Sequence, residues 1–152
     1  IMPPTFIETS AKNFDIYLQL GNWAKKDKTG VCFESSGKLT LPNGAKRVPD
    51  AAWILKDRYY AFSKSERSKK FIKIAPDFVI ELRSDSDRLP RLRKKMEEYI
   101  ENGVRLGWLI DPLEEKVHIY RENGSVEILE NPKFVSGEDV LPKFKLDLAE
   151  IF

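Results

Sequence analysis

One glutamate lies inside an apolar run that is otherwise typical of a buried strand, Phe78-Val79-Ile80-Glu81-Leu82. An ionised carboxylate left unpaired in an apolar setting costs several kcal/mol, or it takes up a proton. Glu81 therefore requires a cation, a cluster of hydrogen-bond donors or a metal ion beside it. Asp50, which follows Pro49 and lies 31 positions before Glu81, is the candidate for a second ligand.

Short apolar segments alternate with helical patterns, which predicts a single α/β domain over residues 1–152 with a mixed sheet. A strand, a helix and a strand in succession over residues 78–110 predict one right-handed parallel crossover, and hairpins elsewhere predict antiparallel pairs. The expected elements are a helix over 13–25, a hairpin of 31–33 with 38–41, a strand over 50–55, an exposed polar excursion over 56–75, a strand over 78–83, a helix capped by residues 84–87 and running to about 102, a strand over 106–110, a hairpin of 117–121 with 126–129, and a tail over 140–148 that packs on the core.

The chain has one cysteine, Cys32, and one histidine, His118, which we expect on the exposed face of a hairpin. An intrachain disulfide is therefore excluded, and the lone cysteine favours a reducing, cytoplasmic setting. No zinc ligand cluster remains, so we expect any chemistry to depend on carboxylates, lysine or arginine. No apolar run approaches the roughly 20 residues that span a bilayer, and no signal peptide is evident. Because the sequence opens on Ile1, we expect further residues upstream.

Charge is unevenly distributed along the chain, although the formal net charge is only +2. Residues 56–105 carry 14 Lys and Arg against 9 Asp and Glu. A basic middle segment suits a polyanion such as nucleic acid, whose binding depends on the neutralisation of phosphates. A solvated basic face is the commoner explanation, and charge alone favours it.

The residues around Glu81 and on the helix that follows offer cations for such a site. Glu81 and Arg83 point to the same face of their strand because side chains alternate. Arg83 is permanently charged and cannot act as a base, so an amine must come from elsewhere. On the helix, Lys94 projects opposite the apolar stripe, whereas Lys95 lies at the edge of the stripe beside Tyr99 and can reach toward the sheet. We therefore expect Lys95 to supply the amine.

Seven segments carry a family resemblance: LPNG at 41–44, RVPDAAW at 47–53, PDFVIELRS at 76–84, KMEEY at 95–99, NGV at 102–104, GWLIDP at 107–112 and VLPKF at 140–144. Together they resemble the Uma-two family of bacterial proteins, placed in the restriction-endonuclease-like, or PD-(D/E)xK, superfamily. The resemblance implies a mixed β-sheet flanked by helices, with Asp50 and Glu81 as metal ligands. It also implies that Lys95 is a lysine relocated from the strand to the helix. The second Pro-Asp pair ends at Asp77 on Glu81's own strand, and we do not expect it to bind metal.

The chain departs from the family pattern at two points. The family usually carries a glutamate ahead of the point where this chain begins, and the nearby substitutes, Asp15, Gln19 and Glu34, are weak ones. Arg83 stands where the superfamily places lysine, so Lys95 has to compensate for it.

The resemblance implies an endonuclease that hydrolyses phosphodiester bonds of nucleic acid, with DNA as the expected substrate. Asp50 and Glu81 would hold Mg²⁺ or Mn²⁺, which polarises the phosphate and lowers the pKa of a bound water. Lys95 would orient or help to deprotonate that water, and Arg83 would neutralise the phosphate. The basic excursion over 64–73 would follow the nucleic-acid backbone, and the candidate contacts are Lys69, Lys70, Arg88 and Arg91. A homodimer is a further expectation, because nucleases of this superfamily often pair their sites.

Plainer structural roles stay open for each candidate residue. Asp50 suits a turn after a proline. Glu81 and Arg83 suit a salt bridge on a solvated edge strand, and Lys95 suits a charged helix face in water. The corresponding functional alternative is a nuclease fold kept as a nucleic-acid-binding or interaction module without turnover.

Overall fold

A computed structural model describes residues 6–69 and 72–152 of the chain. Its helices are α1 (Ile7–Asp27), α2 (Lys56–Tyr60), α3 (Lys64–Lys69) and α4 (Leu89–Glu101). Its strands are β1 (Gly30–Glu34), β2 (Leu39–Thr40), β3 (Lys46–Arg47), β4 (Ala51–Leu55), β5 (Phe78–Leu82), β6 (Leu106–Asp111), β7 (Lys116–Arg121), β8 (Val126–Glu130), β9 (Phe134–Ser136) and β10 (Lys145–Asp147). The predicted mixed α/β class is confirmed. No helix in these ranges is both long and apolar enough to cross a membrane.

Six strands form the main sheet in the order β1-β4-β5-β6-β7-β8. Strands β5 and β6 are parallel and are joined through α4, so the predicted parallel connection is confirmed. The other neighbouring pairs are antiparallel. Strands β9 with β10, and β2 with β3, form two small antiparallel pairs outside this sheet.

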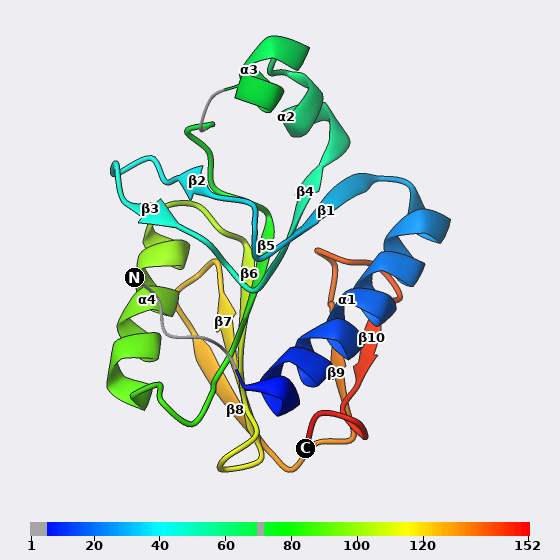
Figure 1. The fold of residues 1–152 in the computed structure, drawn as a ribbon, viewed down its shortest axis with the longest axis vertical. Helices are drawn as coiled ribbons and strands as arrows, with labels where there is room; N and C mark the ends of the chain where they lie inside the picture. Colours follow the sequence, from blue (N-terminus) through cyan, green and yellow to red (C-terminus); the bar gives the residue numbers. More distant parts are fainter. Residues whose placement is uncertain (1–5, 70–71) are drawn as a thin grey trace.

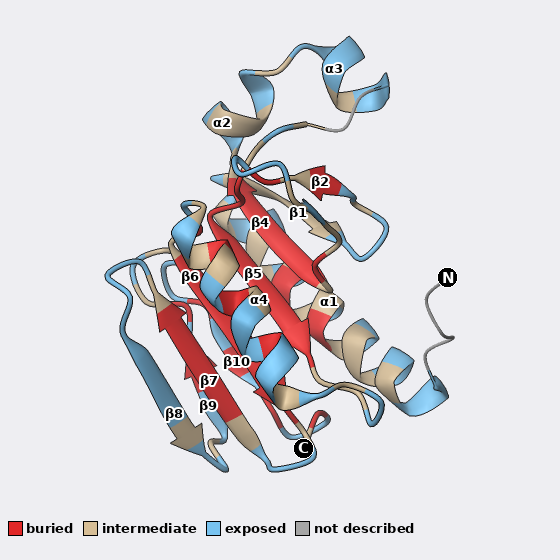
Figure 2. Cartoon of the chain, turned by 90° about the vertical axis from the view of Figure 1, so that its left-hand side faces the viewer, coloured by how far each residue is buried: buried red, intermediate tan, exposed pale blue. Residues whose placement is uncertain are grey.

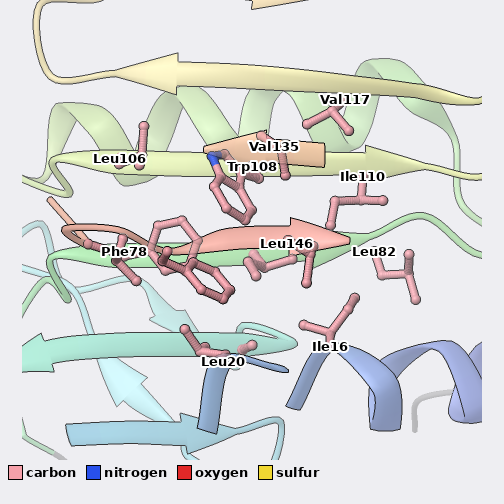
Figure 3. Close-up of a cluster of buried hydrophobic side chains, with 14 of the residues drawn as sticks. Ile16, Leu20, Phe78, Leu82, Leu106, Trp108, Ile110, Val117, Val135 and Leu146 are labelled. Carbon is pink, nitrogen blue, oxygen red and sulfur yellow. The ribbon is translucent and has the colours of Figure 1, made fainter. Parts of the chain in front are cut away.

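Each face of the sheet is covered by a helix and a small strand pair. Helix α1 with β9 and β10 covers one face, and α4 with β2 and β3 covers the other (Figure 1). Phe78 and Trp108 are buried against the α1 side (Figure 3), and so is Ile80. Val79 and Leu109 are buried against the α4 side. All five residues of β5 are buried (Figure 2). Glu81 therefore lies on a central strand, and the alternative that placed it on a solvated edge strand is wrong.

The predicted hairpin of 31–33 with 38–41 is wrong. Strand β1 pairs with β4, with Cys32 opposite Trp53, and β2 pairs with β3 instead. The turn signal at residues 35–37 is real, because the N–H of Gly37 donates to the carbonyl of Glu34. The turn leads the chain out of the main sheet rather than back along β1.

Two helix predictions need correction. Helix α1 begins at Ile7, earlier than predicted, and it buries Ile16 and Leu20 while Phe14 and Leu18 are exposed. Residues 84–87 do not cap α4. The N–H and the hydroxyl of Ser84 donate to the carboxylate of Asp87, and the N-cap residue, Arg88, makes no side-chain hydrogen bond to the helix.

His118 was predicted to be exposed, and it is 1% exposed. It lies opposite Leu109 on β6, on the sheet face that α4 covers. The alternation within β7 could not show this, because both faces of the strand are buried. The predicted packing of the tail is confirmed, since Leu141, Phe144 and Leu146 are buried in the core.

The polar excursion contains the short helices α2 and α3, which bury no residue and project beyond one end of the sheet (Figure 1). The guanidinium of Arg67 lies over the rings of Tyr59 and Tyr60, at 5.1 and 4.8 Å from their centroids. This cation–π contact holds the two helices together.

Candidate active site

Asp50 and Glu81 occupy matching positions on adjacent antiparallel strands. Ala51 pairs with Ile80 across β4 and β5, so the residue before Ala51 lies opposite the residue after Ile80. Ala51 and Ile80 face α1. Because strand side chains alternate, Asp50 and Glu81 both face α4.

Protein donors hold one oxygen of each carboxylate. The N–H of Leu82 donates to Oδ2 of Asp50 at 2.8 Å. The hydroxyl of Tyr99 donates to Oε2 of Glu81 at 2.7 Å, and Nζ of Lys95 lies 3.2 Å from the same Oε2. Asp50, Glu81, Lys95 and Tyr99 therefore form one cluster between β4, β5 and α4.

The amphipathic pattern of α4 delivers Lys95 to this cluster. Leu92, Met96 and Tyr99 are the buried residues of the helix, Lys94 is exposed, and the side chain of Lys95 is 29% exposed. This is the arrangement that the helical wheel predicted. The alternative in which Lys95 simply faces water is wrong, because its amine pairs with Glu81.

Burial disfavours the ionised form of both carboxyl groups in the cluster. Burial raises the pKa of Glu81 to about 7, with Asp50 adding to the rise and Lys95 and Tyr99 opposing it. Burial also raises the pKa of Asp50, while the Leu82 N–H and Lys95 oppose the rise. One lysine faces two carboxylates, so a further cation would relieve the cost of ionising both.

These residues suit a hard divalent ion. Within residues 6–69 and 72–152, no group of three or more His, Cys, Asp or Glu side chains gathers to hold a metal. The donor set is therefore two carboxylates, which is the set that Mg²⁺ commonly takes together with waters and substrate phosphates. Burial raises the pKa of Cys32 to about 12, so its thiol does not offer a thiolate at neutral pH.

A model of the Uma2 family, described as putative restriction endonuclease, matches residues 1–149. The chain belongs to this family. No curated protein matches it. Among solved structures, a putative nuclease belonging to DUF820 from Anabaena variabilis is 24% identical, with a TM-score of 0.82 over 99% of this chain and 82% of that one. The two proteins share a fold.

Arg83 also lies in this region of the Uma2 domain, but its ion pairs are with acids other than Glu81. It pairs with Asp111 at 2.9 Å and with Glu114 at 3.3 Å, and it bonds to the carbonyl of Asp87. Among the described residues, its ion partners are thus acids at the end of β6 and in the following turn. A contact between Arg83 and phosphate stays a prediction.

The predicted nucleic-acid contacts lie on separate elements. Lys69 on α3, Arg91 on α4 and Arg88 at the start of α4 are exposed. Lys70 lies outside the described residues. The predicted roles of these residues in nucleic-acid binding stay predictions.

The three substitutes considered for an upstream glutamate lie elsewhere. Asp15 accepts a hydrogen bond from Gln19, whose amide also bonds to the backbone of Asp147 on β10. Glu34 lies opposite Ala51, and therefore on the α1 side of the sheet. None of them joins Asp50 and Glu81.

Asp77, in the second Pro-Asp pair, has a structural role. It is 2% exposed, and its carboxylate bonds to Arg58, Arg105 and the N–H of Leu55 at 2.9 to 3.0 Å. These contacts tie α2 and the start of β6 to the end of β4.

We expect Asp77→Asn to lower the free energy of unfolding by about 2 kcal/mol, since hydrogen bonds to a charged group are worth about 1.5–3 kcal/mol and both arginines are partly exposed. The amide oxygen can still accept the N–H of Leu55. Urea unfolding measures the change. A loss below about 0.5 kcal/mol would show that the ion pairs contribute nothing.

Tyr99 is the site residue that sequence reasoning missed. Its position in the apolar stripe indicated a core residue, and its side chain is indeed fully buried. Its spacing of four residues from Lys95 was the available signal, because residues i and i+4 share a helix face.

Proposed function

We propose that this protein is a metal-dependent endonuclease that hydrolyses phosphodiester bonds, with DNA as its substrate. The observation that carries the proposal is the opposition of Asp50 and Glu81 across β4 and β5 with the amine of Lys95 3.2 Å from Glu81. Membership of a family described as putative restriction endonuclease supports it.

Each residue has a distinct part in the proposed reaction. Asp50 and Glu81 would hold Mg²⁺ or Mn²⁺, and the ion would polarise the scissile phosphate and lower the pKa of a bound water. Lys95 would orient that water or help to deprotonate it. Arg83 would contact the phosphate only after releasing Asp111 or Glu114.

The nucleic-acid backbone would be bound by exposed basic residues around this site, with Lys69, Arg88 and Arg91 as the described candidates. Such contacts neutralise phosphates and predict binding that weakens with salt. The cytoplasm is the proposed location, on the strength of the single cysteine. A homodimer would pair two such sites.

The test is cleavage of double-stranded DNA, single-stranded DNA and RNA by the purified protein with Mg²⁺ or Mn²⁺, with EDTA as the metal-free control. We expect cutting that EDTA abolishes. Binding of nucleic acid without any cutting at saturating metal would favour the alternative, a nuclease fold that serves as a binding module.

We expect Lys95→Met to lower kcat by about 10² to 10⁴, the usual contribution of a positioned proton-transfer group. The methionine retains the apolar stem of the lysine and removes only its amine. Exposed Lys94 is the matched control, and Lys94→Met should leave kcat within about threefold. An unchanged kcat in Lys95→Met would remove the lysine from the mechanism.

A further inference from the structure

Helix α4 presents two donors to a single oxygen of Glu81. Lys95 and Tyr99 lie one turn apart, and both the amine and the hydroxyl approach Oε2, at 3.2 and 2.7 Å. A carboxylate oxygen has two lone pairs, so it can accept both donors at once. Lys95 and Tyr99 together thus saturate Oε2.

Protein donors and a shared proton hold the two carboxyl groups of the site. Within the described ranges, the donors from the β5 backbone and from α4 all reach Oδ2 of Asp50 or Oε2 of Glu81, and the two carboxyl groups also hydrogen-bond to each other, which requires a proton on one of them. The backbone of β5 holds Oδ2 of Asp50, and two side chains of α4 hold Oε2 of Glu81. A metal ion between the two carboxylates would replace that shared proton while the contacts of Leu82, Tyr99 and Lys95 stay in place.

The two donors on Oε2 differ in their freedom to move. Tyr99 is 0% exposed, and its ring packs in the apolar layer with Leu92, Met96 and Leu109. The side chain of Lys95 is 29% exposed, so its amine can reach water as well as Glu81. Only Tyr99 is therefore in a position to hold Glu81 throughout a reaction in which Lys95 acts on the substrate.

We propose that Tyr99 is the positioning residue of the site: its hydroxyl holds Oε2 of Glu81, and it would keep this carboxylate in place as a metal ligand when Lys95 leaves Glu81 for water or phosphate. This inference rests on the proposed metal-dependent function. It assigns Tyr99 to metal binding and Lys95 to the chemical step, although both contact the same oxygen.

The test is Mn²⁺ affinity measured by titration calorimetry without nucleic acid, on the wild type, Tyr99→Phe and Tyr120→Phe. Removing a residue that orients a metal ligand typically weakens metal binding about 10- to 100-fold, so Tyr99→Phe should raise the Kd for Mn²⁺ about tenfold. Tyr120 is the matched control, because it is 4% exposed in the same apolar layer and contacts neither carboxylate. Tyr120→Phe should leave the Kd within twofold.

Kinetics separate positioning from a general loss of structure. At saturating Mn²⁺ we expect Tyr99→Phe to recover kcat to within about fivefold of the wild type, whereas Lys95→Met does not recover. Thermal unfolding of Tyr99→Phe should stay cooperative, because the phenyl ring fills the same space. A Kd for Mn²⁺ within twofold of the wild type would overturn this inference and leave the proposed function standing. Failure of the wild type to bind Mn²⁺ and to cut would overturn both.

Discussion

Asp50→Asn is expected to abolish metal-dependent cleavage, with a loss of about a thousandfold or more in kcat/KM. The substitution replaces a metal-binding carboxylate by a neutral amide, and the electrostatic stabilisation that a bound ion supplies is worth several kcal/mol, at about 1.4 kcal/mol per tenfold in rate. Cleavage of a labelled DNA duplex at increasing Mg²⁺ and Mn²⁺ measures the loss.

The fold should survive Asp50→Asn for a reason visible in the structure. The amide oxygen of asparagine can accept the N–H of Leu82, which Oδ2 of Asp50 accepts at 2.8 Å. Asp50→Ala would leave that N–H without its partner and would add a cost of about 1–3 kcal/mol. Asparagine thus separates the loss of the metal ligand from a loss of stability.

Asp77→Asn is the matched control, because it makes the same chemical change in the second Pro-Asp pair. It should lower stability and leave the metal dependence of cleavage unchanged. Cleavage by Asp50→Asn at more than a tenth of the wild-type rate would contradict the role of Asp50. So would an equal loss of cleavage in folded Asp77→Asn.

The strand positions of the site could be predicted because they depend on local patterns. An apolar run around Glu81 indicates a strand, and a 3.6-residue repeat places Lys95 at the edge of the buried stripe of α4. Both signals come from residues close in sequence. The structure agrees with them, since Lys95 reaches Glu81 and Lys94 does not.

Strand pairing was harder to predict because it joins distant residues. Strand β1 pairs with β4, with Cys32 opposite Trp53, although β2 and β3 lie between them in the sequence. A turn signal near Gly37 cannot distinguish a hairpin from a departure out of the sheet. His118 was misplaced for a related reason, since β7 is buried on both faces and shows no polar alternation.

Side-chain direction was also beyond the sequence. Arg83 lies two residues after Glu81, and its guanidinium pairs with Asp111 at the end of the neighbouring strand β6 and with Glu114 in the following turn. Tyr99 shows the converse, because a residue placed in the core by its apolar neighbours directs its one polar atom at the site. The register of β5 against β6 places Asp111 beside Arg83. The packing of α4 on the sheet brings the hydroxyl of Tyr99 to Glu81.

The burial that prepares Glu81 for a metal also destabilises the metal-free fold. Burial raises the pKa of Glu81 from an ordinary value of 4.5 to about 7. Below pH 4.5 the carboxyl is neutral in both the folded and the unfolded chain. Between pH 4.5 and 7 the unfolded chain loses its proton first, so stability falls as the pH rises, and above pH 7 the full penalty applies.

We therefore expect Glu81→Gln to stabilise the metal-free protein at pH 8 by about 3 kcal/mol, an upper value that follows from about 1.4 kcal/mol per pKa unit. The amide can still accept the hydroxyl proton of Tyr99. At pH 4.5 the variant and the wild type should differ by less than about 1 kcal/mol. Urea unfolding in EDTA at both pH values measures the two differences.

Saturating Mn²⁺ should reverse this order at pH 8, because an ion that binds only the folded wild type adds to its stability by mass action. The variant, which lacks one ligand, should gain much less. A Glu81→Gln protein that is no more stable than the wild type in EDTA at pH 8 would show that Lys95 and Tyr99 already offset the burial of the charge. In that case the carboxylate would be ionised without a metal, and the electrostatic argument for a bound cation would fail.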